Sequence, residues 1–297
     1  MKIDIVNAEC DLGVHVDGAS QGPKVLKEIL KENQNINNII DMLCDCSNKD
    51  HDDNNLEKNY DRLIKYTTDL YNQVLESKNK GNYTITIGGD HSIAVSSALA
   101  SIKKEEELGI IWIDAHADYN TFETTITGNL HGLPLATING LNKRLSLFHD
   151  RNYYDPKKTV IIGYRSEETN KDEEVKNLKQ AGVTFFTTED IHNNKIEDIV
   201  KKAFEIATNN HNNKVHVSYD LDFIDPYYAP GVSIPEINGP TKEEAIEVAN
   251  NLTSYIKEIA SFDLVEFNPT NDIDNKTLKI AEEILNIIIN SLKKEVN

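Results

Sequence analysis

The chain has 297 residues, of which 39% are hydrophobic and 27% are charged, which is enough for one large α/β domain or two smaller ones. Its 49 acidic residues outnumber its 31 basic residues, so the formal net charge is −18. This balance argues against nucleic acid as a partner, because Lys and Arg must neutralise the phosphates, and equally against an anionic membrane surface.

Strand-like segments alternate with helical segments along nearly the whole chain. The N-terminal residues lack the apolar core of a signal peptide, and we predict that residues 3–6 form the first strand. A polar segment rich in Asn and Asp, residues 47–55, is predicted to be a solvated loop, and a helix is predicted from there to about residue 79. The later predicted strands are residues 83–87, 109–113, 159–164, 183–187, 215–219 and 259–265.

Three further helices are predicted from capping and periodicity. One begins at Ser92, a second follows the capping box at residues 241–244, and the last runs over residues 277–292. Strands that alternate with such helices imply an α/β fold with a parallel sheet covered on both faces. No long linker rich in Pro, Gly or Ser divides the chain, so we predict a single domain over residues 1–297.

The chain has three cysteines, Cys10, Cys44 and Cys46. An odd count does not suggest a disulfide framework, and the spacing of Cys44 and Cys46 is shorter than that of structural zinc sites. We therefore interpret all three as free thiols in a reducing compartment. Because no stretch approaches the roughly 20 apolar residues of a membrane span, we predict a cytoplasmic protein.

Three short segments concentrate carboxylates and imidazoles where a predicted strand ends. They are GGDHS (residues 88–92), DAHAD (114–118) and DLDFID (220–225). Burying a charge is costly, so three such clusters suggest a shared positive centre, and a metal pair is the obvious candidate. In parallel sheets, ligands bind beyond the carboxyl ends of the strands, which is where the three segments would lie.

The spacing of these residues supports a metal centre. Side chains alternate along an extended backbone, so Asp114, His116 and Asp118 can point the same way, and Asp220 and Asp222 repeat the pattern. Carboxylates with only two imidazoles suit a hard divalent ion such as Mn²⁺ better than a Cys-rich zinc site would. Two ions can share a water and lower its pKa toward about 7.

Each segment also has an interpretation without a metal. GGD is ordinary turn chemistry, and DAHAD can be a solvated loop. DLDFID resembles an EF-hand fragment, but it lacks Gly at the sixth position and runs into Pro226. Three acidic or His-containing clusters at strand ends of one chain nevertheless favour a metal.

The motifs GGDHS, DAHAD and SYDLDFIDP, in this order, resemble those of the ureohydrolases: arginase, agmatinase, formimidoylglutamase and their relatives. The resemblance runs over roughly residues 13–269 and implies the arginase-like three-layer α/β/α fold with a central, mostly parallel sheet and two Mn²⁺ per chain. It implies that His91, Asp114, Asp118 and Asp220 bind one ion. The other ion would be bound by His116, Asp114, Asp220 and Asp222, with Asp114 and Asp220 bridging. Asp225 would be structural.

Within this family, the segment after DAHAD is most similar to bacterial-type arginase. DYNT (residues 118–121) and TGNLHG (127–132) match the arginase pattern, in which an Asn and a Ser or Thr receive the substrate α-carboxylate. The resemblance thus assigns substrate binding to Asn120 and Thr127, and we include Asn129 of the same motif. Agmatine lacks this carboxylate, which favours arginine as the substrate.

The resemblance also implies roles for residues near the metals. His131 would be a proton shuttle, and Glu266 would hold the guanidinium in a bidentate clamp. For the α-amino group the family uses an acidic residue after a strand-end Arg, and here Glu168 is the first candidate and Glu174 the second. Residues 233–236, SIPE, depart from the usual Gly-Thr-Pro, so the substrate is less firmly implied than the metal site.

The reaction implied is hydrolysis of L-arginine to L-ornithine and urea. A metal-bridging hydroxide would attack the guanidinium carbon, and Asp118 with His131 would protonate the leaving amine. The alternatives are agmatinase, guanidinobutyrase or formimidoylglutamase, a non-catalytic metal-binding relative, or a deacetylase-like amide hydrolase with one zinc. Family members suggest a homotrimer or hexamer.

Overall fold

The computed structural model of the chain describes residues 2–52, 54–105, 107–144, 153–165 and 171–294. The described residues form one eight-stranded sheet in the order β2-β1-β3-β8-β7-β4-β5-β6, and every neighbouring pair is parallel. The strands are β1 (Ile3–Glu9), β2 (Ile36–Leu43), β3 (Tyr83–Gly88), β4 (Leu108–Ile113), β5 (Thr159–Tyr164), β6 (Thr184–Thr187), β7 (Lys214–Asp220) and β8 (Ile259–Val265).

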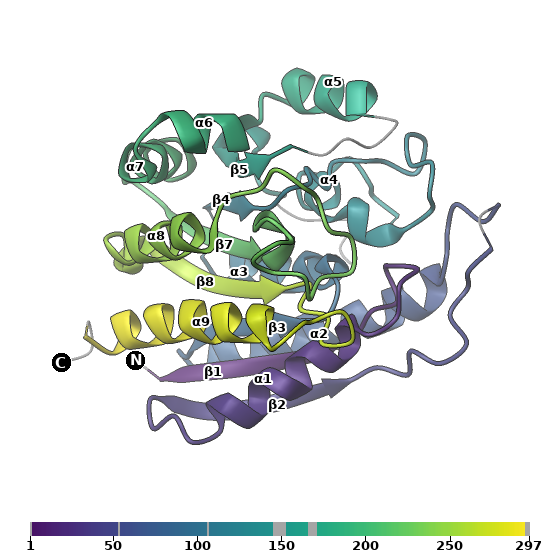
Figure 1. The fold of residues 1–297 in the computed structure, drawn as a ribbon, viewed down its shortest axis with the longest axis horizontal. Helices are drawn as coiled ribbons and strands as arrows, with labels where there is room; N and C mark the ends of the chain where they lie inside the picture. Colours follow the sequence, from purple (N-terminus) through teal and green to yellow (C-terminus); the bar gives the residue numbers. More distant parts are fainter. Residues whose placement is uncertain (1, 53, 106, 145–152, 166–170, 295–297) are drawn as a thin grey trace.

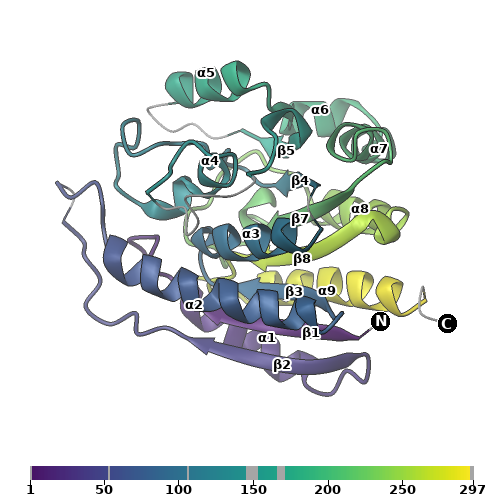
Figure 2. The ribbon, with the colours of Figure 1, turned by 180° about the vertical axis from the view of Figure 1, so that it is seen from behind.

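Helices cover both faces of the sheet (Figures 1 and 2). One face carries α1 (Gly22–Leu30), α6 (Thr188–Asn193), α7 (Ile196–Ala207), α8 (Lys242–Thr253) and α9 (Lys276–Lys294). The other face carries α2 (Tyr60–Asn79), α3 (Ala94–Glu105), α4 (Pro134–Ile138) and α5 (Lys171–Ala181). This arrangement confirms the predicted three-layer α/β/α fold. Among the described helices, none combines the length and apolar character that crossing a membrane requires.

The two faces of the sheet pack into two separate apolar clusters. Along β4, Ile111 and Ile113 face the cluster of α7, α8 and α9, whereas Ile110 and Trp112 face the cluster of α2 and α3. Every residue of β3 and β4 is buried, as expected for central strands of a parallel sheet. Burial of each such Ile contributes roughly 1.5–3 kcal/mol. The double-sided core therefore fixes the strand ends on which the acidic segments lie.

The sequence-based prediction misses β2 and five helices, which are α1, α4, α5, α6 and α7. β2 is an edge strand that pairs only with β1 in the described part of the chain, and its residues are half-buried or exposed. Its two asparagines, Asn37 and Asn38, interrupt the apolar alternation and give a weak strand signal. α1 begins at Gly22-Pro23, which suits the first turn of a helix but also resembles a turn.

The predicted solvated loop at residues 47–55 differs from expectation at Lys49. This side chain is buried, and its ammonium donates hydrogen bonds to the carbonyl oxygens of Asp11, Val14 and Val16 at 3.0–3.2 Å. It also lies 2.8 Å from a carboxylate oxygen of Asp17. A lysine surrounded by acceptors can be buried because its charge is compensated. Lys49 thereby holds residues 11–17 against the carboxyl edge of the sheet.

Candidate metal centre

The acidic segments meet at the carboxyl ends of the adjacent strands β3, β8, β7 and β4. His91 follows β3, Glu266 follows β8, Asp220 ends β7, and Asp114 follows β4. Because all these strands are parallel, their carboxyl ends share one edge of the sheet, and residues up to about 175 positions apart in sequence come into contact. The predicted location is therefore the observed one.

One group of side chains surrounds His91. Its Nδ1 lies 2.9 Å from Oδ2 of Asp220, 3.0 Å from Oδ2 of Asp114 and 3.2 Å from Oδ2 of Asp118. All four side chains are buried. Within the described residues, neither Nδ1 of His91 nor Oδ2 of Asp118 makes a well-aligned hydrogen bond. Buried polar atoms normally have partners, so four donor atoms that converge without bonding each other fit a shared cation.

A second group of side chains surrounds His116. Its Nδ1 lies 3.0 Å from Oδ2 of Asp222 and 3.5 Å from Oδ1 of Asp114. Asp114 thus offers one oxygen to each group, as expected for a bridging carboxylate. Asp220 contacts the first group through Oδ2, while its Oδ1 accepts the backbone N–H of Asp222 at 2.8 Å. The structure therefore brings the six predicted ligands together, and bridging by Asp220 stays a prediction.

Two side chains that sequence reasoning missed orient the first group. The ring of His91 stacks on Trp112 with centroids 3.9 Å apart, and its Nε2 lies 2.8 Å from the hydroxyl of Ser218. Trp112 also donates a hydrogen bond from Nε1 to Asp114 at 2.8 Å. Trp112 and Ser218 are paired across β4 and β7. These contacts turn Nδ1 of His91 toward the carboxylates, which is the usual role of residues behind a metal ligand.

The electrostatics of the cluster favour a bound cation. Burial, together with the charges of Asp222 and Asp114, holds the pKa of Asp220 well above its ordinary value. Burial and the Asp114 charge raise the pKa of Asp118 to about 7. Burial opposes protonation of His91, but the surrounding carboxylates outweigh it and raise the pKa of this imidazole. Carboxylates this close repel one another, and divalent ions would remove that repulsion.

Two residues of the site have a left-handed backbone. Asp118 has φ 50° and Glu266 has φ 65°. This conformation costs a residue other than glycine roughly 1–2 kcal/mol. Neighbouring backbone holds both in place, since the carbonyl of Asp118 accepts the N–H groups of Leu135 and Ala136, and the N–H of Glu266 donates to Gly89 at 2.7 Å. Such local strain is typical of functional positions.

Glu266 and His131 lie next to the carboxylate cluster. Oε1 of Glu266 accepts the backbone N–H of His91 at 2.9 Å and lies 3.0 Å from Nδ1 of His131. Oε2 of Glu266 is buried and has no hydrogen-bond partner among the described residues. Burial opposes the charge of His131, but the contact with Glu266 outweighs it and raises the pKa of His131 to about 9. Glu266 thus keeps one oxygen for a further donor.

Glu174 is the second candidate for the substrate amine, and it is buried beside the DAHAD loop. Its Oε1 accepts the backbone N–H of Tyr119 at 3.0 Å and the side-chain amide of Asn120 at 3.2 Å. Oδ1 of Asn120 in turn accepts the hydroxyl of Thr124 at 3.1 Å. Glu168, the first candidate, lies outside the described residues. The structure therefore joins Glu174 to Asn120, the predicted carboxylate contact.

Thr127 and Asn129 occupy a loop beside residues 11–17. The exposed hydroxyl of Thr127 accepts the N–H of Asn129 at 3.2 Å, and the amide of Asn129 lies 2.8 Å from Nδ1 of His15. Oδ1 of Asn129 is buried and unpartnered within the described part of the chain. Between them, Gly128 has φ +68°, and a Cβ there would lie 2.3 Å from the carbonyl oxygen of Asn55. Only glycine fits this turn without displacing its neighbours.

Glu236 is a further residue that sequence reasoning did not assign to the site. Its Oε1 lies 3.5 Å from Nε2 of His116. It belongs to the SIPE segment that departs from the family pattern. Asp225, predicted to be structural, accepts the N–H groups of Tyr227 and Gly239 and so closes the loop that carries Glu236. This segment therefore adds a carboxylate beside the second group.

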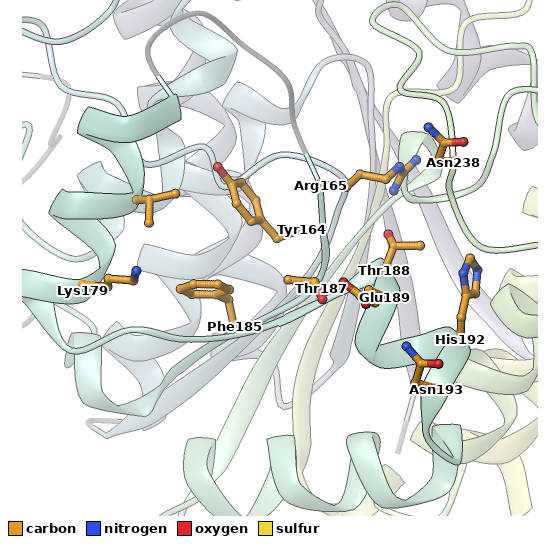
Figure 3. A pocket seen from close by; sticks show the side chains of 11 residues that line it. Tyr164, Arg165, Lys179, Phe185, Thr187, Thr188, Glu189, His192, Asn193 and Asn238 are labelled. Carbon is orange, nitrogen blue, oxygen red and sulfur yellow. The ribbon is translucent and has the colours of Figure 1, made fainter.

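A pocket of about 820 Å³ lies next to the cluster, at the carboxyl ends of β5 and β6 (Figure 3). Its wall toward the cluster is Arg165, whose guanidinium donates to the carbonyl oxygens of Asp222, Phe223 and Glu236 at 2.8–3.0 Å. Because these carbonyls already occupy the guanidinium, Arg165 serves to hold the loops of the site. His192 and Asn193 of α6 also line this pocket.

Comparison with known proteins gives a consistent result. Residues 1–289 match the model of the arginase family. The arginase of Bacillus subtilis (strain 168) is 31% identical over 297 residues, with 97% of each chain covered. The solved arginase of Bacillus caldovelox superimposes with a TM-score of 0.88 at 28% identity, covering 97% of this chain and 98% of that one. A structure described as a hypothetical agmatinase from Burkholderia thailandensis, at 18% identity and a TM-score of 0.75, covers 99% and 87% and shares the fold.

Proposed function

The chain belongs to the arginase family of ureohydrolases, and from this premise we propose that it hydrolyses L-arginine to L-ornithine and urea. The observation that carries this proposal is the adjacency of two features at one sheet edge. These are the His and Asp donor groups around His91 and His116, and the free buried oxygen of Glu266. The first suits a pair of metal ions, and the second suits a guanidinium.

We propose that two Mn²⁺ ions bind here, held by His91, Asp114, Asp118 and Asp220 and by His116, Asp114, Asp220 and Asp222. The unpartnered atoms His91 Nδ1 and Asp118 Oδ2 support a cation in the first group. Four carboxylates with two imidazoles match the ligand preference of Mn²⁺ better than that of softer ions. When bound, such a pair lowers the pKa of a shared water toward about 7 and so supplies hydroxide at neutral pH.

Glu266 is proposed to hold the substrate guanidinium. Its Oε1 is already fixed by the N–H of His91 and by His131, so the carboxylate cannot rotate freely. Oε2 then remains as the acceptor for a guanidinium N–H, in a buried position where a charge-assisted hydrogen bond is strong. A fixed carboxylate orients the reacting carbon toward the metal ligands.

His131 and Asp118 are proposed to handle the proton. Glu266 keeps His131 protonated near neutral pH, as the raised pKa of this imidazole indicates. Asp118 belongs to the first group of donors, and burial and the charge of Asp114 raise its pKa to about 7, against the smaller lowering by His91 and His131. We therefore propose that Asp118 delivers a proton to the leaving amine and that His131 supplies the proton that replaces it.

The amino-acid end of the substrate is proposed to bind at the loops with residues 118–131. Asn120, Thr127 and Asn129 would receive the α-carboxylate, and Glu174 would receive the α-amino group. The hydrogen bond from the amide of Asn120 to Glu174 supports this assignment, because the two charges of a zwitterion also lie close together. The curated relatives named arginase support arginine over agmatine.

The test is a comparison of substrates with the Mn²⁺-loaded protein. Arginine, agmatine and guanidinobutyrate are offered at equal concentration, and released urea is measured. We expect urea mainly from arginine. Urea from agmatine but not from arginine would contradict the proposed substrate while leaving the ureohydrolase chemistry intact.

Variants test the role of Glu266 in the same assay. Glu266→Gln keeps the shape but removes the charge, and we expect kcat/KM for arginine to fall by about 100-fold or more. Glu243→Gln, on the exposed first turn of α8, is the matched control and should leave kcat/KM unchanged. Equal activities of the two variants would rule out the guanidinium clamp.

A further inference from the structure

The three cysteines lie close together just beyond β1 and β2. These two strands lie side by side at one edge of the sheet (Figure 1). β1 and β2 are paired in parallel with Glu9 opposite Leu43, so the next residues, Cys10 and Cys44, lie side by side. Cys46, two residues after Cys44, lies beside both of them. The sulfur atoms of all three lie within 4.8 Å of one another, and none is in a disulfide.

We propose that Cys10, Cys44 and Cys46 form a binding site for a thiophilic metal ion such as Zn²⁺, which joins the edge strand β2 to β1. This site is separate from the carboxylate centre and does not depend on the proposed reaction. A metal–sulfur distance of about 2.3 Å places sulfur ligands of one ion about 4 Å apart, which the observed spacing accommodates. Thiolates select soft or borderline ions, whereas the carboxylate centre suits hard ones.

The thiol cluster carries negative charge, which favours binding of a cation. Hydrogen bonds from the thiols of Cys10 and Cys46 lower the pKa of Cys44 to about 5, so Cys44 is a thiolate at neutral pH. The Sγ of Cys46 also lies 3.5 Å from the backbone N–H of Asp11. Burial raises the pKa of Cys10, and the pKa of Cys46 is raised as well. Binding of one divalent ion by three thiolates would therefore displace the protons that Cys10 and Cys46 retain.

Neighbouring residues hold the thiols in place and leave the site accessible to an ion from solvent. Arg62 of α2 donates hydrogen bonds to the carbonyl oxygens of Asp45, Ser47 and Asn48, which fixes the loop that carries Cys44 and Cys46. The carbonyl of Cys10 accepts the N–H of Asp90 at 3.0 Å, so this strand end is fixed from the other side. Cys10 is buried, whereas Cys44 and Cys46 are half-buried. An ion can therefore reach the site from solvent.

The experiment uses the full-length reduced protein, first loaded with Mn²⁺ and then titrated with Cd²⁺. Cadmium is the probe because thiolate ligands give it an ultraviolet charge-transfer band that carboxylate and imidazole ligands do not. We expect the band to grow until one equivalent is bound, with release of two protons per ion at neutral pH. If Zn²⁺ is bound first, the band should appear only as Cd²⁺ displaces it, and Zn²⁺ should raise the thermal midpoint of the cadmium-free protein.

Cys44→Ser and Cys46→Ser are the test variants, because these half-buried positions tolerate substitution better than Cys10. Each should lose most of the band and the thermal shift, whereas Ser47→Ala in the same loop should keep both. The proposal is overturned by a wild-type protein without the band or by Cys44→Ser with an unchanged band. It is also overturned if denatured wild-type protein, isolated without reductant, shows one free thiol instead of three, since two cysteines would then form a disulfide.

Discussion

At the scale of single residues, the chemistry of the site depends on contacts between positions far apart in sequence. Glu266 contacts both His91 and His131, and it does so from a strained backbone conformation. Its neighbours therefore fix the position of its carboxylate. His131 gains its raised pKa from this same contact, so the proposed proton donor and the proposed guanidinium clamp are coupled.

Replacement of His131 tests this coupling. We expect His131→Asn to lower kcat for arginine by about 100-fold with a small change in KM, because a positioned general acid contributes about 10²–10⁴-fold. The measurement is kcat and KM over a range of pH with full Mn²⁺ occupancy, verified by metal analysis. An unchanged kcat would show that His131 carries no proton in the reaction.

Gly128 controls the loop that carries Thr127, Asn129 and His131. We expect Gly128→Ala to lower the free energy of unfolding by about 1–2 kcal/mol, because alanine is strained at φ +68° and meets the backbone of Asn55. The measurement is denaturant unfolding. Gly132→Ala is the control, because a Cβ there meets nothing within 4 Å among the described residues. Equal stability of the two variants would contradict this account of the loop.

The six predicted ligands come together because they follow adjacent parallel strands whose carboxyl ends share one edge of the sheet. The predicted alternation along extended backbone is wrong in detail, because Asp118 has φ 50° and Asp222 lies in a 3-10 helix, Leu221–Phe223. Trp112, Ser218 and Glu236 could not be predicted, because their contacts with the site depend on strand order and loop path. The same holds for the thiol cluster, since Cys10 meets Cys44 only through the register of β1 and β2. Glu174 was one of two choices, and the structure shows its contact with Asn120.

At the scale of elements, the central strands and the edge strand β6 are predictable from sequence, whereas the edge strand β2 is not. Strands buried on both faces give continuous apolar runs, as in β3, β4 and β8. β2 has one strand neighbour among the described residues and an exposed, Asn-containing sequence, so its pairing comes from tertiary contacts rather than from propensity. The acidic segments follow central strands, so the site could be predicted even though the edge strand β2 could not.

Near its C-terminal end, α2 carries a buried lysine that contacts β8 and that changes its charge within an accessible pH range. Lys78 donates a hydrogen bond to the carbonyl oxygen of Ala260 at 3.0 Å, and burial lowers its pKa to about 8. The unfolded chain, with a pKa of 10.5 at this position, then binds more protons between these two values. Stability conferred through this group therefore rises with pH in that interval.

Lys78→Met tests this linkage. From pH 7.5 to pH 9.5 we expect the unfolding free energy of the wild type to gain about 1–2 kcal/mol relative to Lys78→Met, since only the wild type loses the buried charge. Denaturant unfolding at both pH values gives the comparison. Lys80→Met removes an exposed lysine of the same region and should follow the wild type. A constant difference between wild type and Lys78→Met would contradict the lowered pKa.

At the scale of the whole molecule, the sheet places charge where the reaction is proposed. One continuous sheet with helices on both faces leaves the carboxyl edge as the place where charged loops can gather. The overall charge of −18 also suits a substrate with a cationic guanidinium, since a field of one sign attracts the opposite charge. Organisation as one domain and assembly into trimers or hexamers stay predictions.

We propose that two Mn²⁺ ions at the carboxyl edge of the sheet enable the chain to hydrolyse arginine. The most direct measurement titrates metal-free protein, at a concentration well above the Kd, with Mn²⁺ and records urea release from arginine at each addition. We expect the rate to rise until two ions per chain are bound and then to stay constant. A rate that becomes constant at one ion per chain, or no urea at any ratio, would contradict the proposal.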